Sequence, residues 1–95
     1  MHVSFYDDLQ KTFYTIKTQY AANITASNKL KAATDQLRFS KKQIEKKSPR
    51  SEKRVLLYCI DTLFTLFEEG DTRKVSDFAA TVCDMPQIFM GLRNL

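Results

Sequence analysis

The first 48 residues of this chain contain neither glycine nor proline, and this absence constrains the fold more than any other feature. Sandwiches and barrels need a turn about every 8–12 residues, and such turns rely on these two residue types. The whole chain of 95 residues has only two glycines and two prolines. We therefore expect few, long elements and an all-α fold, with residues 1–95 forming a single helical domain.

Apolar residues run through this stretch with a seven-residue repeat. One set of positions reads Leu9, Ile16, Asn23, Leu30, Leu37 and Ile44, and its partner set reads Tyr6, Phe13, Tyr20, Ser27, Thr34 and Lys41. A sustained repeat of this kind is typical of a coiled-coil-like helix face. It predicts one long N-terminal helix over about residues 4–47, roughly 65 Å in length.

A second structure fits the same pattern. A turn near residues 23–28, in "NITASN", would divide the long helix and give a four-helix bundle. Asn23, Thr25, Ser27 and Asn28 have side chains that favour turns and cap helices. We favour the continuous helix because the heptad phase passes through this segment unchanged, and a buried Asn can fix register in a coiled coil.

The second predicted helix covers about residues 49–69. Ser48 is a good N-cap, and Pro49 suits the first helical position because its missing N–H has no partner there. The apolar residues of this helix cover more than half of its circumference, which predicts packing on two sides. Asp61 projects onto the polar side, where we expect it to form a salt bridge or hydrogen bond with another helix.

Gly70 follows as the C′ residue of the second helix, and Asp71 or Thr72 can cap the next one. The third helix is predicted over about residues 72–84. Pro86 breaks it, because proline lacks the N–H that would bond back by four residues. The expected architecture is an antiparallel helical bundle.

The basic residues are concentrated between Lys29 and Arg54. This stretch holds ten lysines and arginines against three acidic residues, in a chain whose net charge is +4. The candidate residues for binding an anion or an acidic partner are Lys31, Arg38, Lys42, Lys46, Arg50 and Arg54. A positive stripe fits an acidic protein partner or a phosphate backbone, and it is also typical of a solvated helix end.

Two features of the stretch bear on its partner. Arg50, Lys53 and Arg54 fall in the first turn of a predicted helix, where positive charge is unfavourable, so folding alone does not explain them. A docked anion or acidic partner would offset this repulsion. Nucleic acid is not favoured, because Phe39 is the only aromatic residue in the stretch that could stack on bases.

An aromatic-rich stripe follows the first half of the long helix: Tyr6, Leu9, Phe13, Ile16 and Tyr20. Packing into the core is one interpretation of this stripe. The other is a self-association seam, in which the part of a long helix that extends beyond its neighbours pairs with a second copy. A symmetric homodimer would satisfy it.

We expect no catalytic, cofactor-binding or metal-binding residues. The only histidine is His2, and the carboxylates gather at predicted helix ends, which are normally wet. Cys59 and Cys83 lie in apolar helical patterns and are expected to be buried thiols in a reducing compartment, which indicates a cytoplasmic protein. The longest apolar run has thirteen residues and includes Asp61, so we expect no membrane span, and the first residues do not resemble a signal peptide.

The last third of the chain, "FEEGDTRKVSDFAATVCDMPQIFMGLRNL", resembles the later part of small, uncharacterised all-helical bacterial proteins. The matching positions are Asp84, Pro86, Ile88, Gly91, Arg93 and Asn94. Chains of this kind often continue past the segment. The resemblance implies a bacterial, cytoplasmic origin, and it implies no activity and no site residue.

Together these features predict a non-catalytic helical interaction module that self-associates and binds a protein partner. One alternative is a binder of nucleic acid or an anionic surface through residues 29–54. Another is a small inhibitor or immunity-type protein, which the size and charge fit equally well.

Overall fold

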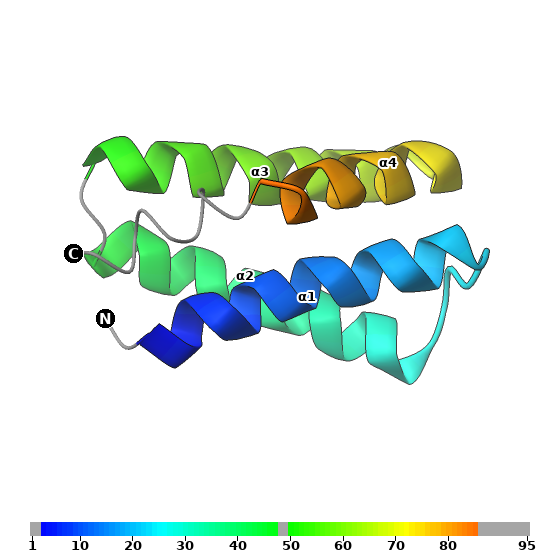
Figure 1. Cartoon of the computed structure of the whole chain (residues 1–95), viewed down its shortest axis with the longest axis horizontal. Coiled ribbons are helices and arrows are strands. Elements are labelled where there is room, and N and C mark those ends of the chain that lie inside the picture. The colour runs from blue at the N-terminus through cyan, green and yellow to red at the C-terminus, as the bar shows by residue number, and fades with distance from the viewer. Residues whose placement is uncertain (1–2, 48–49, 86–95) are drawn as a thin grey trace.

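The computed structural model describes residues 3–47 and 50–85, with side chains for residues 7–46 and 54–85. This part of the chain forms four α-helices and no strand: α1 Val3–Ala21, α2 Asn28–Lys47, α3 Arg50–Glu69 and α4 Thr72–Cys83. Consecutive helices run antiparallel along the long axis of the molecule (Figure 1). The prediction of an all-α antiparallel bundle is confirmed.

The predicted continuous helix over residues 4–47 is wrong, and the alternative turn near residues 23–28 is confirmed. A helix of that span would be about 65 Å long. The longest dimension of the molecule is only 37 Å. Residues 3–47 therefore fold back on themselves as the α1–α2 hairpin.

The turn forms because Asn23 adopts the left-handed conformation, at φ 60°. Its N–H donates to the carbonyl of Tyr20 at 3.0 Å, and the N–H of Ile24 donates to the carbonyl of Gln19 at 2.8 Å. These two bonds make a Schellman C-cap, in which Asn is the usual substitute for Gly. Asn23 is thus a helix stop, although its heptad position suggested a coiled-coil core residue.

Ser27, the other polar residue of the heptad pattern in this segment, caps the start of α2. Its Oγ accepts a hydrogen bond from the N–H of Leu30 at 3.1 Å and donates one to the side-chain oxygen of Gln19 at 3.0 Å. The first bond satisfies one of the free N–H groups of the helix start, and the second links the two ends of the turn.

The connection between α3 and α4 follows the prediction. Gly70 has φ 75°, and its N–H donates to the carbonyls of Leu66 and Phe67. Asp71 is the N-cap of α4, where its carboxylate accepts from the N–H of Lys74 at 3.1 Å. The predicted cap at Ser48 and Pro49 and the predicted break at Pro86 lie outside the described residues.

All four helices contribute apolar side chains to one core. Its buried members are Leu9, Phe13, Ile16, Leu30, Ala33, Leu37, Ile44, Leu56, Cys59, Ile60, Leu63, Val75, Ala79 and Val82. Their seven-residue and three- or four-residue spacings put each set on one face of its helix. The expectation that the second predicted helix packs on two sides is met, because α3 contacts both α2 and α4.

The most extensive helix pairing joins α1 to α4. The buried face of α4 consists of Val75, Ala79 and Val82, and such small side chains let two helix axes approach closely. α1 also packs against α2, so the four helices form a closed ring around the core. None of the described helices is both long and apolar enough to cross a membrane.

Candidate functional site: a basic aromatic groove between α2 and α3

A surface groove runs between α2 and α3. It consists of two adjoining hollows of about 620 and 570 Å³, which share the side chains of Arg38, Phe64 and Glu68. The hollow nearer the α1–α2 turn is also lined by Tyr20 and Phe67. α2 provides one wall of the groove and α3 the other.

The floor of the groove is a cluster of three half-buried aromatic rings. Tyr20 and Phe67 stack with ring centroids 5.7 Å apart and an interplanar angle of 20°. Phe64 meets Phe67 edge to face at 6.0 Å. Burial raises the pKa of the Tyr20 hydroxyl. These aromatic arrangements are favourable in themselves, but they leave apolar surface facing solvent.

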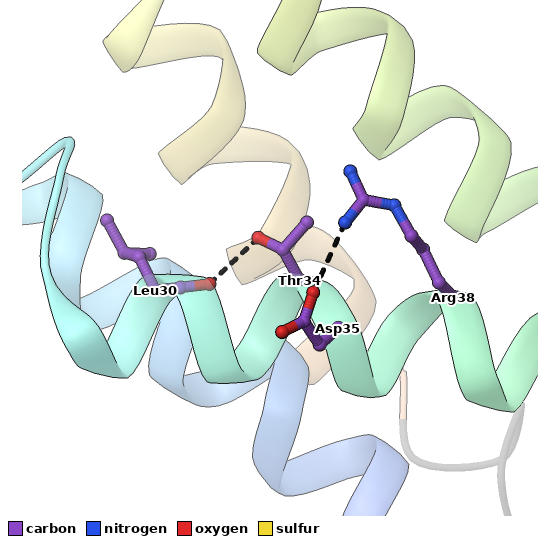
Figure 2. Close-up of polar contacts among 4 residues, drawn as sticks. All are labelled: Leu30, Thr34, Asp35 and Arg38. Carbon is purple, nitrogen blue, oxygen red and sulfur yellow. Dashed lines mark hydrogen bonds and ion pairs between the residues drawn. The ribbon is translucent and has the colours of Figure 1, made fainter.

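Arg38 lies above this floor. Its guanidinium carbon is 5.6 Å from the centre of the Phe64 ring, within the range of a cation–π interaction. Figure 2 shows the side chain reaching from α2 toward α3, with Nη1 also 3.3 Å from the carboxylate of Asp35. Both members of that ion pair are more than 60% exposed, so the pair contributes little and leaves the guanidinium accessible.

The backbone under Arg38 is held in regular helix. The hydroxyl of Thr34, one turn before Arg38, donates to the carbonyl of Leu30 at 2.8 Å (Figure 2). This bond keeps the Thr34 hydroxyl engaged with its own helix. The Thr34 side chain therefore lines the groove without presenting a free hydroxyl donor.

Lys41 and Asp61 link the two walls at 2.7 Å. The hydrogen bond that Lys41 donates to Asp61 is the main reason that the pKa of Lys41 is raised. The expectation that Asp61 contacts another helix is confirmed. This ion pair joins α2 to α3 beside the groove and leaves Lys41 less available to a ligand than the unpaired lysines.

The groove brings together three of the six predicted basic residues, Lys31, Arg38 and Lys42. Lys31 and Lys42 form no hydrogen bond or ion pair with any residue in the described ranges 3–47 and 50–85. Lys46 and Arg54 are exposed but do not line the groove. The side chain of Arg50 lies outside the described residues.

Acidic groups moderate the positive charge. Lys31, Arg38, Lys41 and Lys42 line the groove, together with Glu45 and Glu68. Glu45 is itself engaged in an interaction. Arg38 and Lys41 are already paired with Asp35 and Asp61, so among the described residues the unpaired positive charge of the groove is that of Lys31 and Lys42 on the α2 side.

Three of the five residues predicted as a self-association seam belong to the core. Leu9, Phe13 and Ile16 have no exposed surface in a single chain, so they are not available to a second copy on the folded surface. Tyr20 is half-buried in the groove floor, and the side chain of Tyr6 is outside the described residues. The interpretation as core is correct for the three buried residues.

The aromatic floor was not predicted. Phe64 and Phe67 lie on the wide apolar face that the sequence predicts for residues 49–69, and Tyr20 lies in the aromatic-rich stripe of the first helix. The signal that could have revealed the groove is the width of that face, because neighbouring helices in a four-helix ring cannot cover more than about half of a helix circumference.

The two cysteines and the described carboxylates are the remaining candidates for chemistry. Cys59 is buried as expected, whereas Cys83 is only half-buried; both are free thiols, and burial raises the pKa of each. Across the residues that the structure describes, no three His, Cys, Asp or Glu side chains lie close enough to hold a metal ion.

Comparison with known proteins returns no match among protein families, curated proteins or solved structures. Of the positions that carry the resemblance to bacterial helical proteins, only Asp84 lies within the described residues.

Proposed function

We propose that this protein is a non-catalytic helical interaction module that binds an acidic, amphipathic segment of a partner protein in the α2–α3 groove. The observation that carries the proposal is an aromatic floor bordered by unpaired cations. Phe64 and Phe67 offer apolar surface, while Lys31 and Lys42 have no carboxylate partner in the described part of the chain. An amphipathic helix can cover the aromatic surface with its apolar residues and pair its neighbouring carboxylates with the two lysines.

Arg38 is suited to a carboxylate ligand. Its contact with Phe64 holds the planar guanidinium at the centre of the groove, and its exposed pairing with Asp35 is easily exchanged for another carboxylate. Arginine binds carboxylates through two parallel hydrogen bonds, so a positioned guanidinium adds specificity as well as attraction.

The mixed charge of the groove favours a protein over nucleic acid. Glu45 and Glu68 line it and Asp61 pairs with the lining residue Lys41, so a continuous phosphate backbone would meet negative charges at intervals. A peptide can place neutral or apolar side chains opposite these carboxylates. Inhibition of another protein would be one consequence of such binding.

The free thiols of Cys59 and Cys83 support a role in a reducing compartment, and we place the module in the cytoplasm. This assignment agrees with the implied bacterial origin. The bound segment would then belong to another cytoplasmic protein.

A display library of random peptides of about 16 residues, roughly four helical turns, tests the proposal. Selected peptides should carry net negative charge and apolar residues at helical spacing. Their affinity should fall between about 50 and 200 mM salt, since exposed charge pairs are screened.

Two paired variants locate the binding surface. K31A/K42A should weaken the selected peptides roughly 3- to 10-fold, from two lost exposed charge interactions. The control K11A/K29A removes the same charge from the hollow between α1 and α2 and should leave affinity unchanged. Equal losses in both variants, neutral or basic selected peptides, or tighter binding to a single-stranded oligonucleotide would contradict the proposal.

A further inference from the structure

The α1–α2 turn is held mainly by its own caps. Residues 22–26 are all exposed, so no side chain of that segment anchors the turn in the core. Asn23 is the only residue other than glycine with positive φ in the described part of the chain. That conformation is unfavourable for residues with a Cβ atom, although less so for Asn than for most others. The segment contains no glycine or proline to prevent it from becoming helical.

The core faces on either side of the turn keep a common helical phase. Leu9 and Ile16 on α1 are buried, as are Leu30, Leu37 and Ile44 on α2, and each is seven residues from the next when Asn23 is included. A hairpin does not require this relation, because its turn resets the phase. In a straight helix, however, the relation would put both core faces on the same side.

We propose that this chain dimerises by exchanging α1 between two copies. Residues 22–27 become helical, α1 and α2 join into one helix, and each α1 occupies in its partner the place that it occupies here against α2 and α4. The surface that α1 vacates in one copy is filled by α1 of the other copy, so Leu9, Phe13 and Ile16 regain all of their core contacts. The inference does not depend on the proposed groove function.

The polar residues of the turn fit the exchanged state as well as the closed one. In a twofold dimer the centre of the joined helix lies on the symmetry axis, so Asn23 and Ser27 of both copies meet there. A polar residue at a core position is known to specify register in parallel coiled coils, and in this antiparallel pair Asn23 and Ser27 could hydrogen-bond across the axis. In the closed state the same residues cap α1 and α2.

Exchange would also change the shape of the α2–α3 groove. Tyr20, Thr25 and Ser27 line the hollow nearer the turn, and straightening the turn would move all three. If the proposed function holds, a peptide in the groove stabilises the closed monomer, and dimerisation releases it.

Substitutions of one residue test the exchange. The full chain is refolded at high concentration, and its mass is then measured by light scattering. N23G removes the conformational penalty of the closed turn and should give monomer, whereas N23A increases the penalty and should give dimer. Each of these two substitutions should change the dimer dissociation constant about tenfold or more, because a dimer contains residue 23 twice and the change in conformational penalty is therefore doubled. N28A is the matched control, since Asn28 is helical in both states, and should behave as the native chain.

Cross-linking distinguishes exchange from side-by-side pairing. Lys11 and Lys29 line the same hollow between α1 and α2, so a short amine cross-linker should join them. Unlabelled and isotope-labelled chains are refolded together, and the isolated N23A dimer is cross-linked. Links between Lys11 of one isotope and Lys29 of the other are expected. Links confined to one isotope, or monomeric N23A at every concentration, would overturn the inference.

Discussion

Replacing Phe13 with alanine is expected to lower the free energy of unfolding by about 3–5 kcal/mol. The Phe13 side chain has no exposed surface and packs in the core formed by all four helices. Its truncation loses the transfer free energy of a buried aromatic ring, roughly 2–3 kcal/mol, and adds the cost of a cavity that the helices cannot fully close. The neighbouring Tyr14 is 56% exposed, so Tyr14→Ala should cost less than about 0.5 kcal/mol.

Urea unfolding followed by circular dichroism measures both variants. With a slope near 1.5 kcal/mol per M, the midpoint of Phe13→Ala should fall by roughly 2–3 M. Phe13→Leu provides a milder change for the case in which the alanine variant is already unfolded, and should cost about 1–2 kcal/mol.

The reasoning would be refuted if Phe13→Ala and Tyr14→Ala had similar midpoints. It would also fail if Phe13→Ala lost stability only at high protein concentration, where a dimer forms. The first result would mean that Phe13 is not in the core of the folded chain. The second would mean that it acts only at an interface between copies.

Three further predictions concern single contacts. Asp71→Ala should destabilise the fold by about 1 kcal/mol through loss of the α4 N-cap, whereas Asp77→Ala on the exposed face of α4 should cost less than half of that, as measured by urea unfolding. A double-mutant cycle on Lys41 and Asp61 should give a coupling of about 0.2–1 kcal/mol that largely disappears in roughly 1 M salt, because both side chains are partly exposed; a larger or salt-resistant coupling would contradict this assignment. Burial raises the pKa of the Cys59 thiol above its usual value of 9.0. As pH rises, the thiol therefore ionises first in the unfolded chain, so the urea midpoint should decrease from about pH 8 to about pH 10. Cys59→Ala should make this decrease smaller. An equal decrease in Cys59→Ala would assign the pH dependence to other groups.

The fold class and most boundaries could be predicted from the sequence because they depend on local rules. Gly70 and Asp71 behave as their residue types require, and the periodicity of α3 marks its buried face, which holds Leu56, Ile60 and Leu63. The division of the first 47 residues into two helices could not be predicted from periodicity. Asn23 is suited both to a polar core position of a continuous coiled coil and to the left-handed residue that ends a helix. A choice between them depends on tertiary packing, in which α1 gains contact with α4 of its own chain only when the chain turns.

The candidate groove lies beyond sequence analysis for a similar reason. Lys31, Arg38 and Lys42 were predicted from helical spacing within one element. Tyr20, Phe64 and Phe67 come from two other helices, and their meeting depends on how α1, α2 and α3 are arranged around the core. Helical projection shows that a face is apolar but does not show which part its neighbours leave uncovered.

The pairing of α1 with α4 also has a consequence for biosynthesis. The residues between these helices number about 50, and translation at about 5–20 residues per second adds them in roughly 3–10 s. Throughout that interval the α1 face that will meet α4 has no partner, although α1 and α2 can already form their hairpin. Completion of the core must therefore wait until residues 72–83 leave the ribosome, and a chain stalled before that point would be a substrate for chaperones that bind exposed apolar helices.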